Sequence, residues 1–142
     1  MGVISNIREF AGVVAGEYVI IARGRDDWSM SVTDKHPRLI LPYDVNKNDA
    51  EDKLFRQDFI RRYSGGRGFA NITISILHEI GHWKTRNEVD WELYWAQQEN
   101  VFGQDYFNLP AERMATDWAI NWLSDPEHRK IAKEFEARHF GY

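Results

Sequence analysis

The first third of the chain contains three short apolar stretches separated by polar turns. Residues 17–23 are rich in β-branched side chains, residues 28–33 alternate between polar and apolar positions, and residues 38–43 form a third apolar stretch. Stretches of this length and composition are typical of β-strands, and Pro42 favours an edge or the end of a strand. We therefore predict three strands that form a small, mostly antiparallel meander.

From residue 49 onward the apolar positions recur every three or four residues, as on one face of an α-helix. The clearest stripe lies within residues 69–85 and consists of Ile72, Ile76, Ile80 and Trp83. Further helices are predicted over residues 49–63, 89–99, 109–123 and 125–138, with a loop at residues 102–108. Asn108 is the expected N-cap of the helix that carries Pro110 in its first turn.

Composition indicates one soluble domain. The chain has 142 residues, of which 43% are hydrophobic and 28% charged, so we predict a single α+β domain over residues 1–142. The absence of cysteine excludes disulfides and thiol catalysis, and the net charge of −4 argues against binding nucleic acid through its phosphates. No apolar stretch is long enough for a membrane span, and residues 1–18 make a poor secretion signal. We expect a cytoplasmic protein.

The strongest chemical signal is the sequence His-Glu-Ile-Gly-His at residues 78–82. Because a helix turns by about 100° per residue, His78 and His82 lie about 40° apart on one face and one turn apart. Two imidazoles so arranged can bind a single tetrahedral Zn²⁺. Glu79 lies about 60° further round, beside the metal, where it can act as the catalytic base that deprotonates a water molecule.

The alternative is a histidine pair that binds no metal. Background residue frequencies give this five-residue pattern by chance in roughly one of 250 chains of this length. Gly81 favours the metal site, because glycine costs about 1 kcal/mol relative to alanine inside a helix and is explained if another element approaches closely there.

A catalytic zinc needs a third protein ligand. Glu88 stands where metzincins have a histidine, but the glycine of that pattern is missing, so it is the minor candidate. Glu112 is the stronger candidate, since Ala115 and Ala119 share its helix face and would let that helix pack tightly opposite Gly81. The other reading of Glu112 is a solvated glutamate in a first helical turn.

Several residues are candidates for supporting roles. Thr116 or Asp117 could support a zinc-binding histidine as a hydrogen-bond partner outside the ligand set. An oxyanion needs a donor opposite the zinc, for which the chain offers Tyr63, Tyr106, His128 and His139. Residues 28–33 or 38–43 could form the sheet edge to which an extended peptide adds.

With these motifs the sequence resembles the ImmA/IrrE-type zinc metallopeptidases. That family has a short β-meander, a helix with H-E-x-G-H, and a later helix with a pattern like E-x-x-A-x-x-F-A-x-x-L-L. The second motif corresponds here to Glu112, Ala115, Trp118, Ala119, Trp122 and Leu123, and the resemblance covers about residues 17–125.

The resemblance implies a zincin-like fold of the gluzincin type, with Zn²⁺ bound by His78, His82 and Glu112 and with Glu79 as catalytic base. It also implies site-specific cleavage of a regulatory, repressor-like protein in a phage, mobile-element or stress-response context. The chain has no helix-turn-helix segment, so any link to DNA would lie in that partner.

Two other classes of function stay open at this point. The chain could be a catalytically inactive zincin-fold module that binds a partner, for example as an antirepressor. It could also be a metal-free structural domain in which the motif is incidental. Retention of Glu79 favours the enzyme, because zinc binding alone does not need that base.

Overall fold

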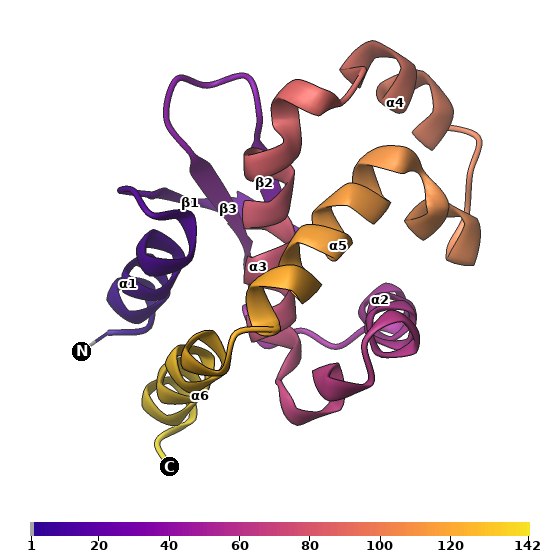
Figure 1. Ribbon diagram of the computed structural model, residues 1–142. Coiled ribbons are helices and arrows are strands. Elements are labelled where there is room, and N and C mark those ends of the chain that lie inside the picture. Colours follow the sequence, from indigo (N-terminus) through magenta and orange to yellow (C-terminus); the bar gives the residue numbers. More distant parts are fainter. Residues whose placement is uncertain (1) are drawn as a thin grey trace.

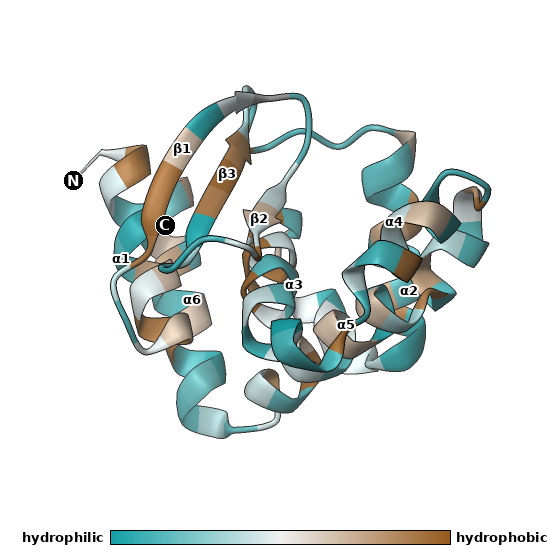
Figure 2. Cartoon of the chain, turned by 90° about the horizontal axis from the view of Figure 1, so that it is seen from above, coloured by the Kyte–Doolittle hydropathy of each residue, from teal (hydrophilic) through white to brown (hydrophobic). Residues whose placement is uncertain are grey.

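The computed structural model describes residues 2–142, and its central element is helix α3 (Asn71–Thr85). Every side chain from Ile72 to Trp83 is buried. The sheet lies on one side of α3 and helix α5 (Pro110–Leu123) crosses it on the other, as Figures 1 and 2 both show. The helix that carries the His-Glu-Ile-Gly-His motif therefore lies at the centre of the core.

The sheet has three strands, β1 (Ile20–Arg25), β2 (Ser29–Ser31) and β3 (Arg38–Pro42), in the order β1-β3-β2. β1 runs parallel to β3, whereas β2 runs antiparallel to it. The predicted antiparallel meander is thus wrong, because β1 and β2 do not pair with each other and half of the pairing is parallel.

The reason lies in the side chains of the third strand. Leu39 and Leu41 of β3 are fully buried, so this strand takes the central place, where both of its edges are covered. β2 is short and carries two serines, which suits the edge of a sheet. Figure 2 shows the same ordering, with β1 and β3 more apolar than β2.

The helices predicted from residue 49 onward are confirmed within a few residues: α2 (Ala50–Arg62), α3, α4 (Trp91–Gln98), α5 and α6 (Pro126–Phe140). The predicted stripe of α3 is buried throughout. The expected cap of α5 is wrong, because Asn108 instead accepts a hydrogen bond from Arg62 (3.0 Å) and Leu109 is the N-cap. Within the predicted loop, Gly103–Asn108 form a 3₁₀ helix, η3.

Helix α1 (Val3–Ala15) has no counterpart in the sequence prediction. It packs beside α6, where the rings of Phe10 and Phe135 stack with their centroids 4.4 Å apart. Its buried face is completed by Ile7 and Val14. None of the helices that the structure describes is long and apolar enough to span a membrane.

A second, smaller buried cluster lies apart from the main core. Tyr94 of α4 packs there with Leu109 and Ala111, at the start of α5, and Tyr106 of η3 covers them. This satellite cluster, residues 89–111, holds one end of α5 in place. Glu112 follows this cluster directly in the sequence.

Candidate metal centre

The two histidines of the motif face α5 from the buried side of α3. The rings of His78 and His82 lie with their centroids 4.7 Å apart and nearly perpendicular, at 85°. Both side chains are buried. The structure therefore places the two imidazoles on one helix face, one turn apart.

Glu112, in the first turn of α5, reaches both rings. Its Oε1 lies 3.0 Å from Nε2 of His78, and its Oε2 lies 3.1 Å from Nε2 of His82. Tetrahedral zinc with bonds of about 2.0–2.1 Å separates its ligand atoms by about 3.3 Å, which is close to both distances. Two imidazoles and one carboxylate are also a typical ligand set of catalytic zinc, so the donor chemistry fits the metal.

Two other carboxylates are further from the histidines. The donor atoms of His78, Glu79 and His82 lie within 4.8 Å of one another, so Glu79 too could approach a metal. Glu112 is the nearer carboxylate to both rings and is the more suitable third ligand. Glu88 is exposed at the end of η2 (Arg86–Glu88), and the structure does not bring it to the site.

The approach of α5 depends on Gly81. A Cβ atom at this position would lie 3.0 Å from both Cα and the carbonyl carbon of Ala115 and would collide with the carbonyl oxygen. Ala115 and Ala119 are fully buried at the crossing. The predicted close approach at Gly81 is confirmed, and it brings the first turn of α5 to the histidine pair.

Of the two candidates for holding a histidine, the structure brings Thr116 into contact. Its Oγ1 lies 2.9 Å from Nδ1 of His78, which orients that ring so that Nε2 faces Glu112. Asp117 is exposed. Nδ1 of His82 is buried and has no hydrogen-bond partner within residues 2–142, so this second ring is held by packing and by Glu112.

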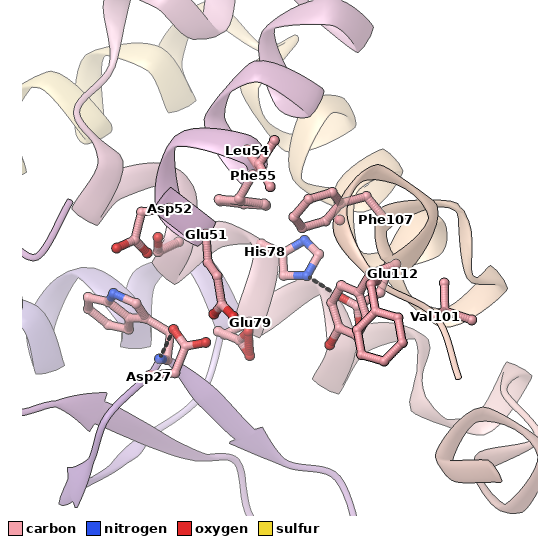
Figure 3. A pocket seen from close by; sticks show the side chains of 15 residues that line it. Asp27, Glu51, Asp52, Leu54, Phe55, His78, Glu79, Val101, Phe107 and Glu112 are labelled. Carbon is pink, nitrogen blue, oxygen red and sulfur yellow. Dashed lines mark hydrogen bonds and ion pairs between the residues drawn. The ribbon is translucent and has the colours of Figure 1, made fainter. Parts of the chain in front are cut away.

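Glu79 points away from Glu112 and into a cleft of about 350 Å³ (Figure 3). The residue is only 9% exposed and lines the cleft together with Asp27 and Glu51. Burial raises the pKa of Glu79, which suits a carboxyl group that must both accept and release a proton.

The cleft has two unlike walls. One is acidic and contains Asp27, Glu51 and Asp52, which Figure 3 shows on the same side as Glu79. The other is apolar and is formed by Leu54, Phe55, Val101, Phe102 and Phe107. Lys47 forms an ion pair with Asp52 of the acidic wall, with its Nζ 2.9 Å from Oδ2. The volume lies in the range of pockets that bind small ligands or a peptide side chain.

Two tyrosines from the satellite cluster complete the site. Oη of Tyr94 donates to Oε2 of Glu112 at 2.5 Å, and Oη of Tyr106 lies 2.9 Å from that of Tyr94. Sequence reasoning missed Tyr94, since nothing in the local pattern of α4 distinguishes it from a packing residue.

Among the four candidates for an oxyanion donor, Tyr106 lines the cleft. The other three are engaged elsewhere in the fold. Tyr63 donates to the carbonyl oxygen of Leu123, His128 stacks on Trp122, and His139 pairs with Asn46.

The charges of the site form a coupled pair. Burial alone would lower the pKa of His82, but the Glu112 carboxylate outweighs it and raises that pKa to about 9. Burial also opposes the charge of Glu112, yet the two histidines hold its pKa well below the ordinary value. Without a metal, a proton on His82 therefore balances the carboxylate, and a divalent cation would replace that proton.

Comparison with protein-family models, with curated proteins and with solved structures finds no match. A proposal about function therefore rests on the geometry of the site and on the two sequence motifs that contribute its residues.

Proposed function

We propose that this chain is a cytoplasmic zinc metallopeptidase with a zincin-like fold, of the ImmA/IrrE type. The main support for the proposal is that Glu112 contacts both His78 and His82, beside a cleft into which Glu79 points. A structural ion pair between Glu112 and the histidines would not need a further carboxyl group in an adjoining cleft. Peptide hydrolysis needs one there as general base, and Glu79 can take this role.

Bound zinc would polarise the scissile carbonyl and make a water molecule more acidic. Glu79 takes a proton from this water as its oxygen adds to the carbonyl carbon, and later gives it to the departing amine nitrogen. Its raised pKa supports both steps, because the protonated form is an accessible state of the buried carboxyl.

Tyr106 is the hydroxyl best suited to the developing oxyanion. It lines the same cleft as Glu79. Burial raises the pKa of Tyr106, so the hydroxyl keeps its one proton. Without substrate this proton points to Tyr94, and with substrate bound the hydroxyl would turn to donate it to the oxyanion instead.

The substrate is proposed to be an extended segment of a regulatory, repressor-like protein. Asp27 and Trp28, which precede β2, line the cleft, and β2 is an edge strand. β3 is central and its backbone is already paired on both sides. An added peptide strand would therefore pair with β2, along residues 28–33.

The test compares wild type, Glu79→Gln and the control Glu88→Gln, which changes an exposed glutamate outside the site. Untagged protein is analysed for metal and incubated with a peptide library prepared from a whole proteome, and cleaved ends are identified by mass spectrometry. We expect one zinc per chain in all three proteins, and cleavage by wild type and Glu88→Gln alone. Equal cleavage by Glu79→Gln would contradict the mechanism. A partner that wild type binds without cutting would support the antirepressor instead.

A further inference from the structure

Tyr94 contacts the proposed metal ligand from outside the metal site. It belongs to the satellite cluster and is almost completely buried, yet its hydroxyl lies 2.5 Å from Oε2 of Glu112. Apolar packing explains the ring. It does not explain a hydroxyl placed at hydrogen-bond distance from the Glu112 carboxylate, which reaches both histidines.

Counting protons fixes the direction of the hydrogen bonds. Oη of Tyr94 donates its single proton to Oε2 of Glu112, because a carboxylate oxygen accepts hydrogen bonds. The oxygen of Tyr94 can then only accept from Tyr106, 2.9 Å away. The chain of donors runs from Tyr106 to Tyr94 to Glu112.

These two hydrogen bonds restrict the rotation of the Glu112 side chain. A glutamate in the first turn of a helix can rotate about its side-chain bonds and turn its carboxylate toward solvent. With Oε2 held by Tyr94, the plane of the carboxylate is fixed and Oε1 stays 3.0 Å from Nε2 of His78. Ligands prearranged in this way bind a metal without first losing conformational freedom.

We propose that Tyr94 is a positioning residue that holds Glu112 in place for Zn²⁺, and that Tyr106 in turn orients Tyr94. The satellite cluster, residues 89–111, then serves as the outer support of the metal site rather than as a separate structural addition. The inference rests on the zinc site of the proposed function, but it does not require that the site cleaves peptides.

The experiment measures zinc affinity by competition with a chromophoric chelator, together with the melting temperature of each metal-free protein. Tyr94→Phe removes the hydroxyl and keeps the ring, and we expect it to weaken zinc binding by about 10–100-fold. Tyr106→Phe should weaken it less, by several-fold, because it removes only the second member of the chain. Tyr18→Phe is the matched control, since Tyr18 is 69% exposed, and it should bind zinc as wild type does.

Cobalt substitution separates positioning from general stability. The visible absorption of Co²⁺ reports the geometry of its ligands, so Tyr94→Phe should change the spectrum and Tyr18→Phe should not. Should Tyr94→Phe fail to fold, Tyr106→Phe, which leaves Tyr94 in place, carries the same two measurements.

The outcomes distinguish this inference from the proposed function. If Tyr94→Phe, or Tyr106→Phe where the former does not fold, matches wild type in zinc affinity and cobalt spectrum, the inference is wrong and the peptidase proposal stands. If wild type binds zinc but cleaves nothing, and Tyr94→Phe binds zinc less tightly, the peptidase proposal fails and the inference stands. If wild type binds no zinc, both are wrong.

Discussion

Gly81 and Ala115 meet backbone to backbone where α3 crosses α5, and no side chain larger than a hydrogen fits at residue 81. His82 follows His78 by four positions, and Glu112 lies three residues before Ala115. The crossing point and the ligands therefore belong to the same two helical turns. A change in the separation of the helices would move Glu112 away from the histidines.

Gly81→Ala should therefore destabilise the protein although alanine is the better helix former. The collision with Ala115 costs about 1–3 kcal/mol as overpacking, against about 1 kcal/mol gained in helix propensity. We expect a net loss in free energy of unfolding, measured with urea, and weaker zinc binding. The control is Gly12→Ala in α1, where an added Cβ meets only ordinary contact at 3.5 Å and should stabilise the protein. A stabilised Gly81→Ala would contradict the close crossing.

Zinc affinity should rise with pH up to about 9. In the metal-free protein His82 carries a proton with a pKa of about 9, raised by Glu112, and zinc must displace this proton. Below pH 9 the apparent dissociation constant should therefore fall about tenfold for each unit of pH, measured by chelator competition between pH 6.5 and 8.5. An affinity that is constant over this range would show that His82 is neutral in the metal-free protein.

The stability of the metal-free protein should show the opposite trend. The pKa of His82 is raised from 6.5 to about 9, so its contribution is fully present below pH 6.5 and is lost as the pH rises through 9. The pKa of Glu112 is lowered, so its contribution is present above 4.5 and is lost as the pH falls toward its folded value. Urea titrations of metal-free wild type should give decreasing stability from pH 6.5 to 9. Glu112→Gln, which lacks the partner of His82, should lose this dependence.

Thr116→Val should weaken zinc binding by about 10–100-fold, because it removes the hydroxyl that orients His78 and keeps the shape of the side chain. Thr116→Ser retains the hydroxyl and should restore most of the affinity. Asp117→Asn changes the exposed neighbour and should have no effect. Equal affinities for the valine and serine variants would show that the contact with His78 does not position the ring.

Tyr106→Phe should lower kcat by about 10²–10³-fold, the usual effect of removing one oxyanion donor, while KM changes little. Its zinc content at saturating metal should match wild type, so the loss cannot be one of metal. Steady-state kinetics on the best peptide from the library provide the measurement. A change confined to KM would place Tyr106 in substrate binding instead.

The helices, and the positions of the two histidines on one of them, could be predicted because they depend on local periodicity. A spacing of four fixes the relative direction of His78 and His82 wherever the helix goes, and the alanines after Glu112 mark the face along which α5 packs. Helix α1 was not predicted, although its buried residues Ile7, Phe10 and Val14 recur with the same periodicity, because it has neither a capping side chain nor an acidic residue in its first turn to mark where a helix begins.

The tertiary structure alone decided the strand order, the choice of Thr116 over Asp117, and the part played by Tyr94. Each depends on a contact between segments far apart in the chain: β1 pairs with β3, α3 with α5, and α4 with the first turn of α5. Local sequence sets which faces of an element are apolar, but it does not set which other element covers them. That is decided by the packing of the whole core, where burial and steric fit are satisfied together.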